Sequence, residues 1–220
     1  MSRHGLPAAT EPAGERPSLV VATRSPHKLR ELRELLHPQR AELLSLDDLG
    51  IADDVAETGE TFETNARQKA RAYARLTGRP VLADDSGLEV DALGGGPGVR
   101  TKRYAGEHAT DEDNNRKLVA ALEGIPSDRR GARYVCVLVL AIPGPAGRLD
   151  CRVTRGTCRG RIATAPRGTG GFGYDPIFEP AAEAFGGRTL GQWSPEEKNR
   201  ISHRARAARR MAPILAEHGF

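Results

Sequence analysis

Two adjacent carboxylates at the end of an apolar run are the clearest chemical feature of this sequence. Asp84 and Asp85 follow Val81-Leu82-Ala83 and precede Ser86-Gly87. The apolar run predicts a buried strand, and Ser86-Gly87 predicts the turn that ends it. Because neighbouring strand side chains point to opposite faces, one aspartate can enter a cleft while the scaffold holds the other. Mg²⁺ binds one or two carboxylates together with phosphate oxygens, so the pair is a candidate metal site. The alternative is a polar strand end without chemistry.

A second polar group lies near the start of the chain, where a predicted buried strand at residues 19–22 turns into a helix. The residues of this turn are Thr23, Arg24, Ser25, Pro26, His27 and Lys28. Such a turn directs backbone N–H groups and the positive end of the helix dipole at one point, which suits phosphate. It lacks the glycines of a Walker loop. The alternative is an ordinary helix start with Ser25 as the N-cap and Pro26 in the first turn.

Glu57 and Lys69 add one acidic and one basic group near a second predicted helix at residues 61–76. Glu57 can join the aspartates around one metal ion, or it can simply complement the dipole of that helix. Lys69 is the one charge on a helix face that is otherwise formed by Phe62, Ala66, Tyr73 and Leu76. It can reach into the same site, or it can lie over apolar surface with its amino group in solvent.

A loop of four glycines and two aromatic residues is the least ordinary segment. Residues 168–176 read Gly-Thr-Gly-Gly-Phe-Gly-Tyr-Asp-Pro. The glycines permit close backbone approach, Phe172 or Tyr174 can stack on a base, and Asp175 can accept a hydrogen bond from a base or sugar. The alternative is a tight loop between strands with its rings in the core.

Basic side chains gather in a predicted last helix that opens at Ser194-Pro195, where Glu197 completes a capping box. Lys198, His203 and Arg204 lie in its first turns. Their N–H groups can read acceptor atoms of a base, although a solvated basic face is a strong alternative.

Strands alternate with helices along the chain, which indicates an α/β protein. A capping box at Thr110 and Asp113 predicts a third helix that ends near Gly124. Residues 134–142 predict the strongest strand, and residues 148–158 are expected to pair with it across a Pro/Gly turn. This hairpin indicates a mixed sheet. Residues 1–17 predict a disordered tail, and residues 18–220 predict one domain.

Composition adds weaker constraints. The chain of 220 residues has 33 Lys and Arg against 29 Asp and Glu, and its pI is about 9.2. This balance favours anionic partners without choosing between nucleic acid and a small polyphosphate. The three cysteines have no C-x-x-C spacing, and Cys136 in its apolar run predicts a buried thiol. Reduced thiols and the lack of an export signal predict a cytoplasmic protein, and no run reaches the length of a membrane span.

Taken together and in this order, these segments resemble the inosine/xanthosine triphosphate pyrophosphatase family. The resemblance extends from about residue 19 to about residue 211. The matching stretches are residues 23–28, 57–59 with Asn65 and Lys69-Ala70, 83–88, 94–98, 103–106, 170–176, 197–198 and 201–204. Each motif is weak alone, whereas their joint order is highly specific.

The resemblance implies a two-lobed α/β fold around a long mixed sheet, an active site in the cleft between the lobes, and a homodimer. It also implies Mg²⁺-dependent hydrolysis of deaminated purine nucleoside triphosphates (ITP, dITP, XTP) to the monophosphate and pyrophosphate. Asp85 matches the catalytic base or a metal-associated carboxylate, and Glu57 matches a metal ligand. The expected substrate-binding residues are Thr23, Arg24, Ser25, Pro26, His27, Lys28, Lys69, Ser86, Phe172, Gly173, Tyr174, Asp175, Lys198, His203 and Arg204.

Two positions depart from the family pattern. Ser25 stands where the family usually has asparagine, and it is shorter and offers no amide to a phosphate; Arg100 stands where tyrosine is frequent. One alternative function is a pyrimidine or modified-nucleotide pyrophosphatase on a related fold. A less favoured alternative is a nucleic-acid-binding protein that uses the basic last helix, because only 5% of residues are aromatic and no single-strand platform motif occurs. Neither a nucleic-acid partner nor a membrane partner is expected.

Overall fold

The computed structural model of the protein describes residues 17–36 and 41–220. Their six strands form one mixed sheet in the order β2-β1-β3-β4-β5-β6. β1 pairs in parallel with β2 and β3, and the remaining pairs are antiparallel. The strands are β1 (Ser18–Ala22), β2 (Glu42–Ser45), β3 (Val81–Val90), β4 (Gly131–Pro143), β5 (Leu149–Ile162) and β6 (Phe178–Pro180). The α-helices are α1 (Pro26–Leu36), α2 (Phe62–Thr77), α3 (Asp111–Ala121), α4 (Pro195–Ile201) and α5 (His203–Glu217). The predicted α/β class with a mixed sheet is confirmed.

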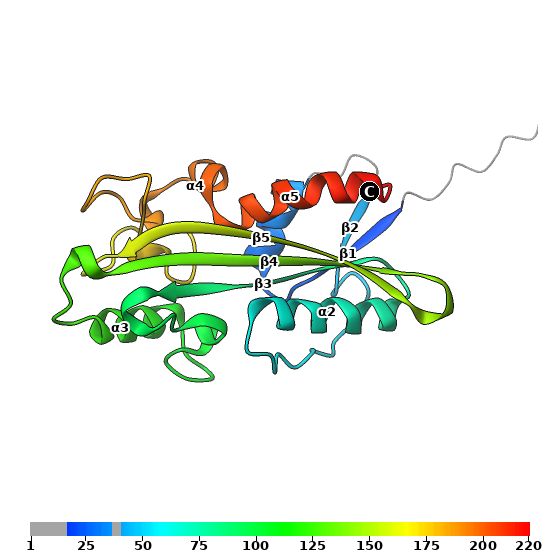
Figure 1. Cartoon of the computed structure of the whole chain (residues 1–220), viewed down its shortest axis with the longest axis horizontal. Helices are drawn as coiled ribbons and strands as arrows, with labels where there is room; N and C mark the ends of the chain where they lie inside the picture. The colour runs from blue at the N-terminus through cyan, green and yellow to red at the C-terminus, as the bar shows by residue number, and fades with distance from the viewer. Residues whose placement is uncertain (1–16, 37–40) are drawn as a thin grey trace, which may run out of the picture.

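Helices cover both faces of this sheet, with α2 and α3 on one side and α4 and α5 on the other (Figure 1). α2 packs on its face through Ala66, Ala70 and Tyr73. α1 and α5 pack on the opposite face through Leu32 and Met211. A third apolar cluster, which includes residues of α3 and β6, lies at the far end of the long strands. The centre of β3 therefore lies between the apolar clusters of the two ends.

β3 is longer than the sequence predicts. The predicted turn at Ser86-Gly87 is wrong, because both residues continue the antiparallel ladder to β4 and the strand ends only at Val90. Asp84 and Asp85 consequently lie in the middle of a central strand and not at its end. The rigid sheet, and not a loop, fixes the position of both carboxylates.

Gly87 is needed for close packing and not for a turn. A Cβ atom at this position would lie 2.7 Å from the carbonyl oxygen of Gly98 and 2.8 Å from the ring of Phe62. Both distances are shorter than the van der Waals contact of about 3.5 Å between carbon atoms. Glycine here lets the segment after β3 and the start of α2 approach the strand.

The predicted start of α3 is confirmed, and α2 also begins with a capped turn. Thr61 caps α2 by accepting a hydrogen bond from the backbone N–H of Thr64, and Gly78 ends this helix in the left-handed conformation. Thr110 and Asp113 form the predicted capping box of α3. These local hydrogen bonds satisfy backbone groups that a helix end leaves free.

The predicted single last helix is wrong, since the structure contains α4 and α5 with Ser202 between them. The backbone of Ser202 is extended (φ −59°, ψ 156°), and its hydroxyl accepts a hydrogen bond from the N–H of Ala205. Lys198 therefore lies on α4, whereas His203 and Arg204 open α5. The break allows Lys198 and Arg204 to approach α1 from two separate helices.

The predicted tail, apart from Pro17, falls outside the described residues. Within residues 17–36 and 41–220, no helix combines the length and apolar character needed to span a bilayer. Cys136, Cys151 and Cys158 are free thiols, and Cys136 is buried as predicted.

Candidate active site

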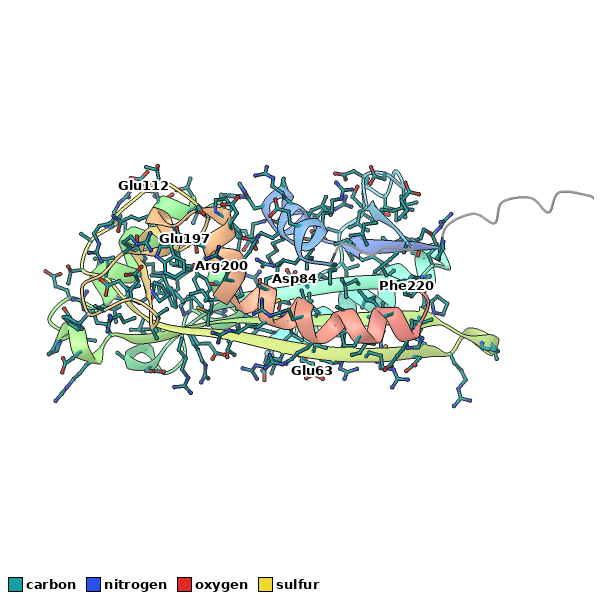
Figure 2. The ribbon with its side chains drawn as sticks, turned by 90° about the horizontal axis from the view of Figure 1, so that it is seen from above. Glu63, Asp84, Glu112, Glu197, Arg200 and Phe220 are labelled. Atoms are coloured by element: carbon teal, nitrogen blue, oxygen red, sulfur yellow. The ribbon has the colours of Figure 1, made fainter. Side chains whose placement is uncertain are left out.

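Asp84 is the buried anchor of the site. Its Oδ1 lies 2.6 Å from Lys28 Nζ, and its Oδ2 accepts from Arg204 Nε at 3.3 Å and from Cys136 Sγ at 3.2 Å. Burial favours the neutral acid, but the charges of Lys28 and Arg204 outweigh it and hold the pKa of Asp84 well below its ordinary value. Asp84 is labelled in Figure 2 at the middle of the molecule, and it binds cations from both α1 and α5.

Asp85 points to the opposite face of β3, toward α2, which confirms the predicted division between the two aspartates. Its Oδ2 accepts from Asn65 Nδ2 at 3.1 Å, and the residue is 5% exposed. Burial raises the pKa of Asp85, the charges of Lys69 and Lys28 oppose the rise, and the negative charges of Glu57 and Asp84 add to it, so that the pKa is about 6. A carboxylate with this pKa can accept a proton near neutral pH.

Lys69 connects the segment that carries Glu57 to strand β3. Its Nζ donates to Glu57 Oε1 at 2.8 Å and to the carbonyl oxygen of Asp84 at 2.6 Å. Burial lowers the pKa of Lys69, but the charges of Asp85 and Glu57 outweigh burial and raise it above its ordinary value. Lys69 is only 7% exposed. The alternative of a solvated amino group is therefore wrong.

Asn65 holds the loop of Glu57 against this strand. Its Oδ1 accepts from the N–H of Gly59 at 2.7 Å while its Nδ2 donates to Asp85. One amide thus fixes both the acid on β3 and the segment before α2. Asn65 follows Glu57 by eight residues, but nothing in its spacing alone indicates this bridging role.

The acidic side chains suit a hard cation that also binds phosphate. Among the described residues, no cluster of three or more His, Cys, Asp or Glu side chains forms a closed metal site. Mg²⁺ needs only one or two carboxylates when phosphate oxygens and water supply its other ligands. Repulsion from Glu57 and Asp84 contributes to the raised pKa of Asp85, and a bound cation would relieve that repulsion. Glu57 and Asp85 are therefore suited to bind Mg²⁺ together with phosphate oxygens.

The turn before α1 is built as a capped helix start. Ser25 Oγ accepts from the N–H of Lys28 at 3.4 Å, and the N–H of Ser25 donates to Thr23 Oγ1 at 3.2 Å. The capping interpretation of Ser25 is thus confirmed, and it is compatible with anion binding at the same helix end. Lys28 lies one turn into the helix with its amino group on Asp84.

Arg24 braces a neighbouring segment. Its guanidinium donates to Asp47 Oδ1 at 2.9 Å and to the carbonyl oxygens of Ile51 and Asp53 at 2.6 and 2.9 Å. These contacts lead away from the acidic pair and tie the turn before α1 to residues 47–53. These contacts give Arg24 a positioning role, and its contact with the substrate stays a prediction.

A second polar cluster surrounds Asp175 in the glycine-rich loop. Asp175 is buried and accepts from Lys198 Nζ at 2.7 Å, from the N–H of Phe172 at 3.0 Å and from the Tyr134 hydroxyl at 3.3 Å. Asp175 therefore positions Lys198 and shapes the loop.

Glu31 joins this second cluster to Asp84, and sequence reasoning missed it. Its carboxylate accepts from Lys198 at 3.0 Å and also pairs with Arg204, whose Nη2 donates to Ser86 Oγ at 2.9 Å. Burial would raise the pKa of Glu31, but Arg204 and Lys198 lower it. The available signal was the i, i+3 spacing from Lys28, which places both side chains on one face of α1.

The aromatic ring of Phe172 lies on this ionic network. It stacks on His27 of α1, with ring centroids 5.1 Å apart and planes 14° from parallel. Lys198 Nζ is 4.4 Å from the Phe172 centroid. Backbone hydrogen bonds tie Gly173 to α3, because its N–H donates to Asp111 and its carbonyl oxygen accepts from Asn115.

Tyr174 and His203, both predicted to bind substrate, face the core. The Tyr174 hydroxyl donates to the carbonyl oxygen of Thr101 at 2.8 Å. His203 stacks on Tyr134 at 4.7 Å, and burial together with the charge of Arg204 holds its pKa far below the ordinary value. His203 is therefore neutral, and a direct contact with a base would require it to be uncovered.

The fold and the site together define an α/β protein with a site suited to a nucleotide. The start of α1 suits phosphate, the two aspartates lie beside two lysines, and the ring of Phe172 lies beside buried cations. The sequence profile of the Ham1 family matches residues 19–214. The chain belongs to the Ham1 family.

Individual relatives agree with this assignment. Proteins named dITP/XTP pyrophosphatase are 51% identical in Geobacillus kaustophilus (86% of this chain, 89% of the relative) and 50% identical in Symbiobacterium thermophilum (91% and 98%). A solved HAM1 protein from Coxiella burnetii is 39% identical with a TM-score of 0.81, over 91% of this chain and 99% of that one. A solved nucleoside-triphosphatase, dITP/XTP pyrophosphatase, from Mycobacterium abscessus is 43% identical with a TM-score of 0.71, over 90% and 99%.

Proposed function

We propose that this protein hydrolyses deaminated purine nucleoside triphosphates, such as ITP, dITP and XTP, to the monophosphate and pyrophosphate. One observation carries the proposal: a buried ionic network runs from Asp84 through Arg204, Glu31 and Lys198 to Asp175. It connects a carboxylate site suited to phosphate chemistry with an aromatic ring suited to a base. The relatives named dITP/XTP pyrophosphatase support the same activity.

The triphosphate is placed at the start of α1. A nucleoside triphosphate carries roughly four negative charges, so hydrolysis depends mainly on positioning and charge neutralisation. Lys28 and Lys69 supply positive charge on the two faces of β3. Glu57 and Asp85 would hold Mg²⁺, which neutralises phosphate charge when it is bound.

Asp85 is the proposed general base. It takes a proton from water as the water oxygen forms a bond to the α-phosphorus, and the bond between that phosphorus and the bridging oxygen breaks. Pyrophosphate then leaves with the bridging oxygen, and Lys28 and Lys69 balance its charge. In the metal-free protein the pKa of Asp85 is about 6, so the carboxylate is largely ionised at neutral pH and able to accept a proton.

Base selection depends on whether the group at C6 of the purine accepts or donates a hydrogen bond. Hypoxanthine and xanthine carry an acceptor oxygen at C6, where adenine carries an amino donor. Lys198 and Arg204 are donors only, so they favour the oxygen and reject the amino group. A site that leaves a buried polar group unpaired discriminates by several powers of ten.

Assembly and location complete the proposal. We place the protein in the cytoplasm, where its three free thiols persist. Its resemblance to the pyrophosphatase family supports a homodimer, which light scattering coupled to gel filtration would measure.

Pyrophosphate release from a panel of ITP, XTP, ATP, GTP and UTP, with and without Mg²⁺, tests the function. We expect ITP and XTP to be good substrates and ATP a poor one. Preference for UTP would instead select a pyrimidine pyrophosphatase, and equal rates for ITP and ATP would contradict the base-selection argument. Asp85→Asn should lower kcat by roughly 10²–10⁴, and a variant as active as the parent would remove Asp85 from the role of base.

A further inference from the structure

Two aromatic rings from distant parts of the chain face each other at the base end of the site. His27 comes from the first turn of α1, and Phe172 comes from the glycine-rich loop. Their centroids are 5.1 Å apart and their planes are 14° from parallel. His27 is exposed, whereas Phe172 is partly buried.

The surroundings of the pair are those of a base-binding slot. Lys198 Nζ lies 4.4 Å from the Phe172 centroid, and Arg204 Cζ lies 5.9 Å from it. Both donors are fixed by Glu31. Both cations lie over the ring of Phe172, so a planar heterocycle stacked on that ring would have N–H donors close to its acceptor oxygens.

We propose that His27 and Phe172 form a clamp that opens to receive the purine, so that His27 covers one face of the base and Phe172 the other. This inference rests on the proposed function and assigns His27 to the base, in place of a phosphate contact. Aromatic contacts on each face of the base require about 7 Å between the two rings, since each contact needs about 3.5 Å. The two rings, whose centroids are 5.1 Å apart, must therefore separate before a base can lie between them.

The ring of Phe172 has space for this movement. Phe172 is flanked by Gly171 (φ 73°) and Gly173 (φ 63°), which adopt a conformation that other residues rarely take. Behind the loop, toward α3, lies a cavity of about 850 Å³ whose wall includes Phe172 and Gly173. The cavity gives the ring space to turn away from α1, while the hydrogen bonds of Gly173 to Asp111 and Asn115 keep the loop backbone on α3.

A different role for the stack gives the opposite result. If His27 only holds Phe172 over the donors as a plug, removing the imidazole frees the slot and improves substrate binding. If His27 instead contacts phosphate, its loss weakens every ligand that carries a polyphosphate. These two roles can be separated from the clamp with one pair of variants.

The experiment compares His27→Ala with Arg30→Ala, a control that replaces an exposed side chain one turn further along α1. For His27→Ala we expect KM for ITP to rise by roughly fivefold or more, kcat to stay within twofold, and inhibition by inorganic tripolyphosphate to be unchanged. His27→Trp should restore KM, and Arg30→Ala should match the parent. An unchanged or lower KM in His27→Ala overturns the clamp, and so does an equal loss of tripolyphosphate inhibition.

A calorimetric measurement of inosine monophosphate binding tests the clamp without any catalytic turnover. We expect His27→Ala to weaken this binding by a similar factor, whereas Arg30→Ala leaves it unchanged. A parent protein that hydrolyses no deaminated nucleotide would refute the proposed function, while the calorimetry still decides whether His27 supports the base. Equal binding by parent and His27→Ala would refute the clamp alone.

Discussion

Replacing Asp85 by asparagine should stabilise the metal-free protein at neutral and alkaline pH, even though it removes the proposed base. Burial and the charges of Glu57 and Asp84 raise the pKa of Asp85 from 3.8 to about 6. The carboxyl therefore ionises less readily in the folded protein than in the unfolded chain, and stability decreases as the pH rises between these two values. At 1.36 kcal/mol per pH unit, the cost above pH 6 is about 3 kcal/mol.

Hydrogen bonding reduces the gain. Asp85 accepts from Asn65 Nδ2 at 3.1 Å and from the N–H of Ser86 at 2.9 Å. An asparagine retains one acceptor oxygen, so one of these bonds is lost at a cost of about 1 kcal/mol. The net stabilisation is about 2 kcal/mol, which corresponds to a Tm increase of about 4–8 °C for a chain of this size.

Thermal unfolding in EDTA, at a series of pH values between 4 and 8, measures this effect. Asp85→Asn should exceed the parent in Tm at pH 8, and the difference should decrease toward pH 4, where the folded parent is protonated at Asp85. Asp84→Asn is the matched control: its carboxylate is paired with Lys28 and Arg204, so its loss should cost about 3–5 kcal/mol. A lower Tm for Asp85→Asn at pH 8, or a difference that does not change with pH, would refute the reasoning.

Other perturbations test the surroundings of the acidic pair. Lys69→Met removes a charge that lowers the pKa of Asp85, so the acidic limb of kcat/KM against pH should move to higher pH; an unmoved limb would separate Lys69 from the base. Gly87→Ala places a Cβ 2.7 Å from the carbonyl oxygen of Gly98, and urea titration should show a loss of about 1–3 kcal/mol in the free energy of unfolding; an unchanged midpoint would mean that the backbones can separate. EDTA should abolish pyrophosphate release with the circular dichroism unchanged, and Mg²⁺ should restore it; activity that persists in EDTA would exclude the metal role of Glu57 and Asp85.

Local signals in the sequence predicted the elements whose ends depend on nearby hydrogen bonds. Thr110 and Asp113 form the capping box of α3 as expected, because the donors and acceptors involved are three residues apart. The sequence placed Lys69 on an apolar helix face and left open whether its amino group is buried, and the structure buries it. The opposite orientations of Asp84 and Asp85 required only the alternation of a strand.

Features that depend on distant segments were not predictable in this way. Ser86 and Gly87 have the composition of a turn, but pairing with β4 extends the strand through them. Ser202 ends α4 and caps α5 within a sequence that reads as one continuous basic helix. Arg24 contacts acceptors 23 to 29 residues away. In each case tertiary contacts outweigh local preference.

The complete burial of Arg204 limits how this protein can evolve. The guanidinium of Arg204 is buried and binds Asp84 and Ser86 of β3. It also pairs with Glu31, which binds Lys198. A mutation at Arg204 that adapted the protein to another nucleobase would also disturb the strand that carries the acid pair. We therefore expect substrate range to change more readily at exposed side chains such as His27, where a substitution leaves the reacting groups intact.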